Sequence, residues 1–386
     1  MKILLVHNYY KQRGGEDVVV EQELSLLRER GHDVELHAVH NDAIQGWRGK
    51  LSAGLLAIYN PFAKQIFTER LQRFRPDVVH VHNFFPQLSP AIFDACRAAR
   101  VPSVMTLHNF RILCPTATLS LNGKIEERSL THSALWTVRR RAYQESALAT
   151  LPVAMMVDIH KAVRTWRRKV DLFIALTDFA KAKFVEGGLP AERIVVKPNA
   201  ISDPGRPDDS TPRRGALYVG RLSPEKGIAT LLEAWRTLDV PLTIAGGGPM
   251  SEQCSQAANG RIKYLGAVDP QRVRDEMCRA AFLILPSTCY DMFPLTLLEA
   301  YANGLPVLAS KLGALQSLVD HGQTGLSFVS GSPEALREAV TRAIANPADM
   351  VRMGRNARSV YEAHYTAEQN HANLMTAYRR AMMNTS

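Results

Sequence analysis

The sequence predicts an α/β protein made of two domains, each built around a parallel β-sheet. Three observations support this prediction. Short apolar segments alternate with segments of helical periodicity, as in parallel sheets with crossover helices. The chain has 386 residues, which is enough for two domains that each have a core. A polar, proline-rich stretch at 199–214 lies between the two halves and is the predicted linker.

The first half opens with a strand, a glycine-containing loop and a helix. The short apolar segment 2–6 is the predicted strand, and Gly14 and Gly15 lie in the loop that follows it. Apolar residues then recur at helical spacing over 18–30, and Gly31 ends this helix. On this evidence alone, the glycine pair is an ordinary loop feature.

Two further strands of the first half end in histidine-containing stretches. His80, His82 and Asn83 lie at the end of one strand, and His108 follows the apolar segment 103–107. Alternate residues of a strand share a face, so His80 and His82 have the arrangement of metal ligands. No third ligand is evident, and we predict no metal site. For His108, an active-site role and an ordinary core or loop position are about equally common.

The second half contains a basic loop between a strand and a helix. Arg221 and Lys226 lie between the apolar segment 216–219 and the helical pattern 227–236. A cation at a helix N-terminus costs roughly 0.3 to 1 kcal/mol unless an anion binds there. The loop therefore predicts a site for an anion such as a diphosphate, although two surface cations would give the same pattern.

Two carboxylates lie around the start of a later helix. The apolar segment 281–285 is a predicted buried strand that Pro286 ends, and Pro294 suits the first turn of the next helix. Asp291 and Glu299 lie before and within that helix. Free helix N–H groups suit phosphate oxygens, whereas carboxylates accept hydrogen bonds from sugar hydroxyls. The pattern favours a nucleotide sugar, but a loop aspartate and a helix-surface glutamate would look the same.

A glycine-rich turn between these two loops adds a backbone that can approach a ligand closely. The segment 244–250 ends a strand in three successive glycines, and 264–268 is a further strand end. Neither segment has the G-x-G-x-x-G fingerprint or a Walker A sequence. The sequence therefore argues against a dehydrogenase and an NTPase.

These motifs resemble those of a known family. Asp291 and Glu299 are separated by seven residues, and Arg221 and Lys226 have Arg-x4-Lys spacing. Both resemble signatures of the retaining glycosyltransferases of the GT-B fold, family 4 (group 1 type, bacterial-like). The usual first acid of that pair is Glu, so Asp291 departs from it by about one methylene. The resemblance implies two Rossmann-like domains that face a cleft, with a C-terminal helix that crosses back to the first domain. The implied ranges are 1–198 for the acceptor-side domain, 199–214 for the linker, 215–365 for the nucleotide-sugar-binding domain and 366–386 for the crossover helix.

The resemblance also implies roles for individual residues. Arg221 and Lys226 would bind the donor diphosphate, Glu299 the ribose hydroxyls and Asp291 the transferred sugar. His108 would lie between sugar and acceptor, so that His108 and Asp291 are the candidate catalytic residues. Further donor-binding candidates are Gly14, Gly15, Gly247, Phe293, Pro294 and Leu295, and the acceptor-side candidates are His82, Asn83, Asn109 and Arg111.

The implied activity is transfer of a hexose-type sugar from a UDP- or GDP-sugar to a saccharide or lipid-linked saccharide, in cell-surface polysaccharide or lipopolysaccharide synthesis. The chain has no Asp-x-Asp motif, so we expect the donor to bind without a metal ion and no other cofactor to be required. Two alternatives stay open. One is a nucleotide-sugar epimerase of the same fold, and the other is a non-catalytic scaffold that binds nucleotide sugar.

Positive charge is concentrated in the first half of the chain. The net charge is +10, and residues 1–200 hold 28 Lys and Arg against 19 Asp and Glu. Within 135–170, eight basic residues oppose two acids around the apolar segment 147–157, with Trp136 and Trp166 nearby. This segment suits an anionic membrane surface, and a core helix with solvated basic ends fits equally well. No nucleic-acid-binding motif is present, and we expect no nucleic-acid partner.

The cysteines and the N-terminus bear on the compartment. Five cysteines without a C-x-x-C pair indicate a reducing environment. The first apolar run, 3–6, is too short for a signal-peptide core. We therefore expect a cytoplasmic protein that is in part peripheral on the inner face of the membrane.

Overall fold

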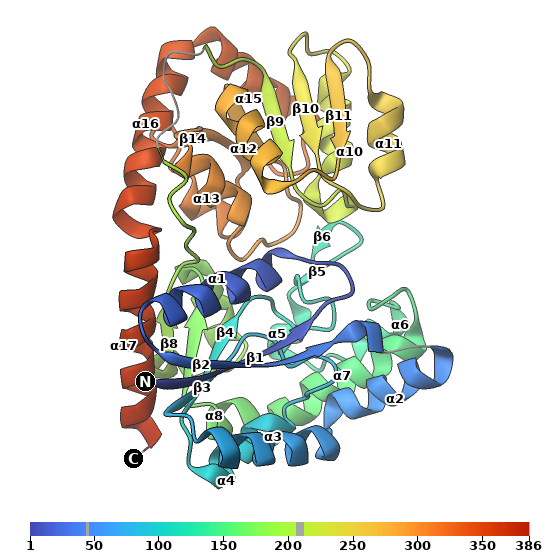
Figure 1. The fold of residues 1–386 in the computed structure, drawn as a ribbon. Helices are drawn as coiled ribbons and strands as arrows, with labels where there is room; N and C mark the ends of the chain where they lie inside the picture. The colour runs from blue at the N-terminus through green and yellow to red at the C-terminus, as the bar shows by residue number, and fades with distance from the viewer. Residues whose placement is uncertain (44–45, 206–211, 386) are drawn as a thin grey trace. The chain divides into compact units, whose positions relative to one another are not determined.

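The computed structural model (Figure 1) describes residues 1–43, 46–205 and 212–385, which form two compact units. Unit 1 comprises Met1–Leu121, Glu126–Asn199 and Glu368–Ser386, and unit 2 comprises Asn122–Ile125 and Ala200–Ala367. Each unit holds a six-stranded parallel sheet with helices around it, which confirms the predicted pair of Rossmann-like α/β units. Part of the predicted linker, 206–211, lies outside the described residues.

The sheet of unit 1 has the strand order β2-β1-β3-β4-β7-β8. Its four inner strands are buried along most of their length, as is usual for parallel sheets with both faces covered, whereas the two edge strands are mostly half-buried or exposed. The strands are β1 (Lys2–Tyr9), β2 (Asp33–His40), β3 (Val78–Val81), β4 (Ser103–Leu107), β7 (Leu172–Ala175) and β8 (Ile194–Val196). A separate two-stranded sheet pairs β5 (Ser120–Leu121) with β6 (Lys124–Ile125).

The helices of unit 1 include one from the end of the chain. Leu374 and Tyr378 of the last helix pack in one core cluster with Ile3, Leu5 and Leu27, which confirms that the C-terminal helix returns to the first domain. The helical segments are α1 (Gly15–Glu29), η1 (Asn41–Ala43), α2 (Gly46–Ile58), α3 (Pro61–Phe74), α4 (Ala91–Ala99), α5 (Arg128–Thr131), α6 (Trp136–Arg139), α7 (Ala147–Ala162), α8 (Thr165–Lys169), α9 (Asp178–Glu186), η2 (Ala191–Arg193) and α17 (Ala367–Thr385).

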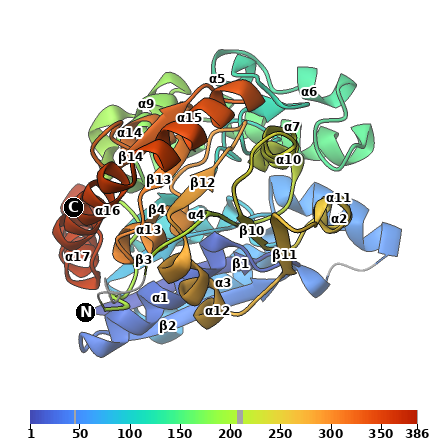
Figure 2. The ribbon, with the colours of Figure 1, turned by 90° about the horizontal axis from the view of Figure 1, so that it is seen from above.

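The sheet of unit 2 has the order β11-β10-β9-β12-β13-β14, and its strands β12, β13 and β14 lie side by side in Figure 2. Its strands are β9 (Ala216–Val219), β10 (Leu242–Ala245), β11 (Ile262–Gly266), β12 (Phe282–Leu285), β13 (Val307–Ser310) and β14 (Gly325–Phe328). The helical segments are η3 (Pro224–Lys226), α10 (Ile228–Trp235), α11 (Ser251–Ala257), α12 (Pro270–Arg279), α13 (Leu295–Ala302), α14 (Leu315–Leu318), α15 (Pro333–Ala345) and α16 (Pro347–His364).

Both sheets contain a point where the direction of strand addition reverses. In unit 1 the chain adds β2 on one side of β1 and β3 on the other, and in unit 2 β10 and β12 flank β9. Loops diverge at such a point and leave a crevice at the carboxyl ends of the strands, where open α/β sheets bind ligands. Ligand-binding sites are therefore expected in the loops after β1 and β3 of unit 1 and after β9 and β12 of unit 2.

One local prediction is wrong. Pro294 is not in the first turn of α13 but is its N-cap residue, with φ −66° and ψ 126°, and Leu295 begins the helix. Trp166 is buried against Phe84 and Phe93, so it belongs to the core of unit 1 and adds no surface to the basic segment. The parts of the chain that the structure describes contain no helix that is both long and apolar enough to cross a membrane.

Candidate functional site

The loop after β9 is held against the end of β12 by a glycine. Gly227 has φ +75°, and a Cβ atom there would lie 1.9 Å from the carbonyl oxygen of Pro286. Any side chain would push the two loops apart. Lys226 immediately precedes this contact, at the end of η3 and two residues before α10, so the fold places its ammonium beside the loop that follows β12.

Asp291 is the residue of that loop that meets Lys226. Its Oδ1 forms an ion pair with Lys226 Nζ, and its Oδ2 accepts a hydrogen bond from Ser287 Oγ at 2.5 Å. Burial lowers the pKa of Lys226, but the adjacent Asp291 outweighs burial, and the net shift of the Lys226 pKa is upward. Lys226 is therefore a cation whose charge an acidic side chain now balances.

Glu299 lies in the second turn of α13 and is poised differently. Burial raises the pKa of its carboxyl group, and no described residue hydrogen-bonds to that group. Such a partly desolvated acceptor gains from hydroxyl donors of a ligand. Phe293 is buried and contacts the ring of Tyr365 edge-on at 5.4 Å, while Pro294 and Leu295 form the start of α13, where backbone N–H groups are free of helical partners.

The glycine-rich turn after β10 packs against the same β9 loop. A Cβ at Gly246 would lie 1.9 Å from the carbonyl oxygen of Gly220, so this position requires glycine. At Gly247, the predicted donor contact, a Cβ would meet only Ala267 at 3.7 Å, an ordinary distance. Arg221 is exposed, and its carbonyl accepts a hydrogen bond from Tyr218 at 2.8 Å, which fixes the backbone and leaves the guanidinium at the surface.

In unit 1 the glycine pair caps helix α1. The backbone N–H of Gly14 donates to Asp17 Oδ2 at 2.8 Å, and Asp17 Oδ1 pairs with His7 Nε2 at 2.7 Å. A Cβ at Gly14 would meet only Asp17 Oδ2, at 4.0 Å, so the packing of the unit does not itself require glycine there. Gly15 is the first residue of α1.

Three of the acceptor-side candidates have structural partners. Asn83 donates to the carbonyl of Asn8 at 2.8 Å and accepts from the N–H of Phe85 at 2.9 Å. Asn109 accepts from the N–H of Arg111 at 2.9 Å. The guanidinium of Arg111 donates to the carbonyl of Pro115 and also lies over the rings of two aromatic residues, Phe85 at 4.9 Å and Tyr143 at 5.0 Å. These contacts order the loops after β3 and β4.

Three histidines lie together at the strand ends, and two of them are hydrogen-bonded to each other. His82 Nδ1 lies 2.9 Å from His108 Nε2, with the two rings stacked at 5.2 Å. His80 bonds Thr106 Oγ1 at 2.7 Å and Tyr378 Oη at 2.8 Å. Burial, with smaller effects from neighbouring charges, lowers the pKa of His80 and His82 and brings the pKa of His108 to about 3. All three are therefore neutral at pH 7.

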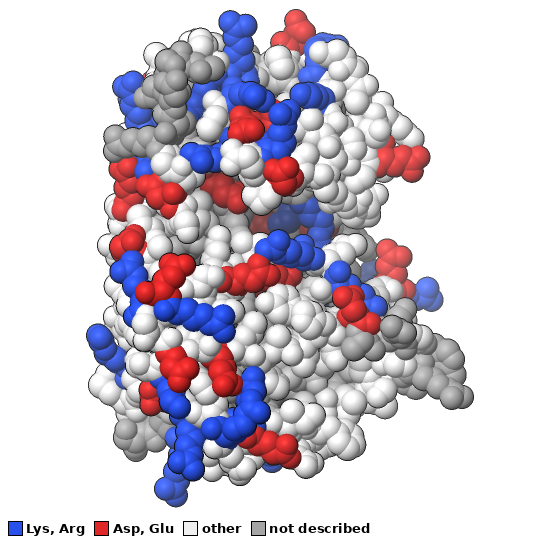
Figure 3. Space-filling view, viewed as in Figure 1, with Lys and Arg blue, Asp and Glu red and all other residues white. Residues whose placement is uncertain are grey.

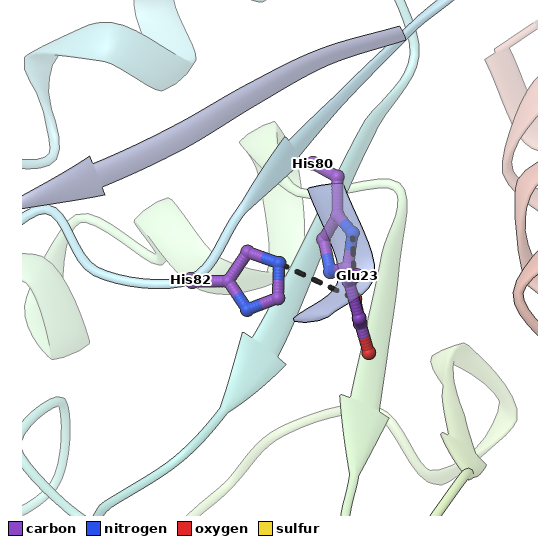
Figure 4. Close-up of side chains that lie close together, drawn as sticks. All are labelled: Glu23, His80 and His82. Atoms are coloured by element: carbon purple, nitrogen blue, oxygen red, sulfur yellow. Dashed lines mark ion pairs between the residues drawn. The ribbon is translucent and has the colours of Figure 1, made fainter. Parts of the chain in front are cut away.

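Sequence reasoning missed a charged residue, Glu23, that lies beside these histidines. Glu23 of α1 places its Oε2 3.5 Å from His82 Nε2 and 3.9 Å from His80 Nδ1 (Figure 4). Its Oε1 pairs with Lys197 Nζ at 2.7 Å, and both side chains are buried. The available signal was a charged residue on the apolar face of α1, between Val20 and Leu26.

Glu23, His80 and His82 have the geometry of a metal-ligand set, since their ligand atoms all lie within 4.8 Å of one another. A carboxylate with two imidazoles is a donor set that zinc accepts. However, Lys197 already neutralises Glu23, and Tyr378 already occupies His80 Nδ1. A metal cation would have to compete with the charge of Lys197 for Glu23 and displace the Tyr378 hydroxyl from His80 Nδ1.

Glu16 is a second residue that the sequence motifs did not single out. Its Oε2 accepts hydrogen bonds from Tyr10 Oη at 3.3 Å and Asn109 Nδ2 at 3.4 Å, while its Oε1 is buried with no hydrogen-bond partner. Burial, followed by the charge of Asp17, raises the pKa of Glu16 to about 8. The Glu16 carboxyl group is therefore largely protonated at pH 7, and it loses its proton as the pH rises through about 8.

Two family models match almost the whole chain. Residues 13–203 match Glycosyltransferase Family 4, and residues 207–360 match Glycosyl transferases group 1. The boundary between the two matches falls within the proline-rich stretch at 199–214.

Individual relatives are distant. A glycogen synthase from Mycobacterium tuberculosis is 30% identical over 305 residues, which is 76% of this chain and 66% of that enzyme. A D-rhamnosyltransferase from Pseudomonas aeruginosa is 32% identical over 157 residues, 39% of this chain and 41% of the relative. The chain thus spans less than two thirds of the length of these curated relatives. An Anabaena protein, HepE, solved with UDP-glucose, superposes with a TM-score of 0.70 at 18% identity over 97% of this chain and 99% of that one.

Proposed function

We propose that this chain, which belongs to the group 1 glycosyltransferases of family 4, transfers a hexose-type sugar from a nucleoside diphosphate sugar to a saccharide or lipid-linked saccharide. The observation that carries the proposal is in unit 2. Lys226 of the loop after β9 pairs with Asp291 of the loop after β12, at the switch point between the two strands, and α13, which carries Glu299, begins four residues after Asp291. Phosphates and sugar hydroxyls are the two chemistries that such a set binds together.

Lys226 and Arg221 are the proposed diphosphate ligands. In the structure Lys226 pairs with Asp291, so a diphosphate that binds Lys226 would compete with that carboxylate. Once displaced, Asp291 would be available for hydroxyls of the transferred sugar, as the resemblance implies. Before the donor binds, the ion pair holds both side chains in place. In the bound state, Lys226 would contact a phosphate and Asp291 a sugar hydroxyl.

Glu299 and the start of α13 are proposed to bind the rest of the donor. The unpartnered, partly desolvated carboxylate of Glu299 suits the two ribose hydroxyls. The N–H groups at Leu295 and the residues after it suit phosphate oxygens, and Gly247 contributes backbone to the nucleotide side. Uridine is our first choice of base because the Anabaena neighbour was solved with UDP-glucose, and a GDP-sugar is the second.

The proposed chemistry is transfer with retention of anomeric configuration. Lys226, Arg221 and the α13 N-terminus stabilise charge on the diphosphate as the sugar–phosphate bond breaks. Because the chain lacks an Asp-x-Asp motif, these groups take the place that a metal ion holds in other transferases. His108 is proposed to lie between the sugar and the acceptor. Like Gly14, Gly15 and the acceptor-side loops, it is part of unit 1.

We further propose that helix α7 contacts an anionic membrane, where a lipid-linked acceptor for cell-surface polysaccharide or lipopolysaccharide would be found. One face of α7 is buried, yet four apolar residues spaced by three or four positions also line its exposed face. They are Leu148, which is 83% exposed, Leu151, Met155 and Ile159. An apolar stripe in water beside basic residues suits a lipid headgroup boundary.

The basic residues around α7 are largely free to meet such a surface. Arg139, Arg140 and Arg141 are exposed before the helix, and Arg167 and Arg168 are exposed after it. By contrast, on the face seen in Figure 3, lysine and arginine are interspersed with aspartate and glutamate. The proposal therefore rests on the neighbourhood of α7 and not on the net charge of the chain.

A ligand screen tests the donor assignment. A ligand that binds only the folded protein raises its apparent stability by about 2.7 kcal/mol at a concentration 100 times Kd. We expect UDP-sugars or GDP-sugars to raise the melting temperature and Glu299→Gln to reduce that rise, with Asp291→Glu retaining it. Equal melting temperatures with and without every nucleotide sugar would reject the donor site.

A further inference from the structure

We propose that Glu23, acting through His82, fixes the tautomer of His108, so that His108 presents an unprotonated Nδ1 to a substrate hydroxyl. The inference rests on the proposed function, in which His108 lies between the donor sugar and the acceptor. Glu23 and His82 are positioning residues in this account, because they act on His108 and do not touch the substrate.

The first link joins two buried atoms that have no hydrogen-bond partner. Glu23 Oε2 and His82 Nε2 are both buried and unpaired, and they lie 3.5 Å apart. A buried donor or acceptor without a hydrogen-bond partner is unfavourable, because it has lost its hydrogen bonds to water. A proton on His82 Nε2 that points at the carboxylate satisfies both atoms through a small rotation of either side chain. The alternative tautomer would leave two acceptors facing each other.

The carboxylate is held in place from its other side. Lys197 Nζ donates to Glu23 Oε1 at 2.7 Å and to Asn370 Oδ1 at 2.6 Å, so three buried polar residues from α1, the end of β8 and α17 lock together. The ion pair keeps Glu23 an acceptor. Since Lys197 takes Oε1, only Oε2 is left for His82.

The second link transmits this choice to His108. With its proton on Nε2, His82 has a lone pair on Nδ1, which lies 2.9 Å from His108 Nε2. That bond requires a proton on His108 Nε2. His108 is neutral because burial, followed by the nearby charges of His7 and Lys197, lowers its pKa, so its only other ring nitrogen carries no proton.

The remaining nitrogen is the one that can act on a ligand. No described residue hydrogen-bonds to His108 Nδ1, and the residue is only half-buried at the carboxyl end of β4, where sheets of this type bind ligands. A neutral imidazole nitrogen accepts a hydrogen bond from a hydroxyl and orients its oxygen. It would not donate to a phosphate, which separates this role from that of Lys226.

The competing assignment, a metal ion on Glu23, His80 and His82, predicts the opposite tautomer. A metal on His82 Nε2 leaves its proton on Nδ1, so His82 becomes the donor to His108 Nε2. His108 would then carry its proton on Nδ1. The protonated nitrogen of His108 therefore distinguishes the two readings.

The test is nitrogen NMR of the full chain labelled with ¹⁵N-histidine, which reports the protonated nitrogen of each ring, together with the zinc content. We expect His108 to be the Nε2–H tautomer at pH 7. We expect Glu23→Gln with Lys197→Met, which neutralises the ion pair as a unit, to shift His108 towards the Nδ1–H tautomer, because the Gln amide can donate to His82 Nε2. Glu29→Gln, an exposed change on the same helix, is the matched control.

A second pair of variants covers the case in which that double substitution does not fold. His82→Asn keeps an acceptor near the position of Nδ1 and should keep the Nε2–H tautomer of His108, whereas His82→Leu should lose it. An Nδ1–H tautomer in the unmodified protein, or one tautomer in all variants, would overturn the proposal. An Nδ1–H tautomer with one equivalent of zinc would assign the three side chains to a metal.

Turnover gives a separate readout. We expect His82→Leu to lower kcat about 100-fold, the range of a lost acid–base group, with His82→Asn within a few-fold of the unmodified protein and nucleotide affinity unchanged in both. Equal kcat for the two variants would overturn the role of the tautomer in transfer. If the unmodified protein transfers no sugar, the proposed function fails, while the tautomer result still decides the relay.

Discussion

Among single residues, Lys226 is central to the proposed diphosphate site, because Asp291 already balances its charge. In the proposed function, a diphosphate that binds Lys226 would replace that carboxylate, so that donor binding would release Asp291. The exposed Arg221 has no such competitor among the described residues and is free to meet a phosphate directly.

Removal of either cation should weaken diphosphate binding selectively. A charge-assisted hydrogen bond contributes about 1.5 to 3 kcal/mol, so Lys226→Ala and Arg221→Ala should each weaken nucleoside diphosphate binding by roughly 10- to 150-fold. Binding of the nucleoside alone should change little. Titration calorimetry with UDP, GDP and the two nucleosides measures the difference, and Arg236→Ala, an exposed change at the end of α10, is the control. Equal losses for diphosphate and nucleoside would remove both residues from the site.

Glu16 predicts a pH dependence of stability in unit 1. Its folded pKa, about 8, lies above the ordinary value of 4.5, so between these values the folded state binds more protons than the unfolded state. The free energy of unfolding should therefore fall as pH rises across this interval, by up to about 1.4 kcal/mol per pH unit from this group. Urea denaturation at several pH values from 5 to 9 should show a shallower fall in Glu16→Gln. Glu29→Gln, a change at an exposed residue of the same helix, serves as control, and parallel curves for Glu16→Gln and the unmodified protein would contradict the assignment.

At this scale the sequence predicted positions better than partners. Arg221, Lys226 and Asp291 could be placed because parallel strands end at one edge of their sheet. Glu23 and Lys197 could not, since they pair across 174 positions and no local pattern relates two residues that far apart. The sequence left open whether the segment around Trp166 faces a membrane or the core, because composition does not show which face of a segment is buried, and the structure places Trp166 in the core.

Among the elements, helix α7 departs from an ordinary amphipathic helix. Its buried face follows from packing against its unit, but apolar residues are also partly exposed on its other face, Leu148 almost fully. The basic ends and apolar centre of the segment could be predicted from the sequence. Its division into α6, α7 and α8 could not, because short helices leave little periodicity to detect.

Attachment to vesicles tests the proposed role of α7. Each basic side chain near an anionic surface contributes about 1 kcal/mol, so Gln at Arg139, Arg140, Arg141, Arg167 and Arg168 should abolish cosedimentation with phosphatidylserine vesicles. Gln at Leu148, Leu151, Met155 and Ile159 should also weaken it, and salt should weaken binding of the unmodified protein. Val329→Gln replaces another exposed apolar residue, in unit 2, and should have no effect. If the unmodified protein stays in solution at low salt, α7 is a structural helix only.

At the scale of the whole molecule, the two sheets share one feature of topology, in that the direction of strand addition reverses once in each. Each reverses its strand order beside β1 or β9. In unit 2 the Lys226–Asp291 pair joins the two loops at that reversal, whereas in unit 1 the buried Glu23 and His80 lie in α1 and β3. The number of sheets and their parallel class could be predicted from the alternation of strands and helices. Membership of α17 in unit 1 followed only from the family resemblance, since the periodicity of a helix does not show which sheet it covers.

The most direct test of the central claim is to incubate the full chain with sugar-labelled UDP- and GDP-hexoses and a panel of saccharide and lipid-linked acceptors, and to follow the label. We expect the label to pass to an acceptor with release of an equal amount of nucleoside diphosphate, and Lys226→Ala to slow that release. A label found in an epimer of the donor without any acceptor would show an epimerase. Donor that binds but stays intact with every acceptor would show a scaffold, and either result would contradict the transferase assignment.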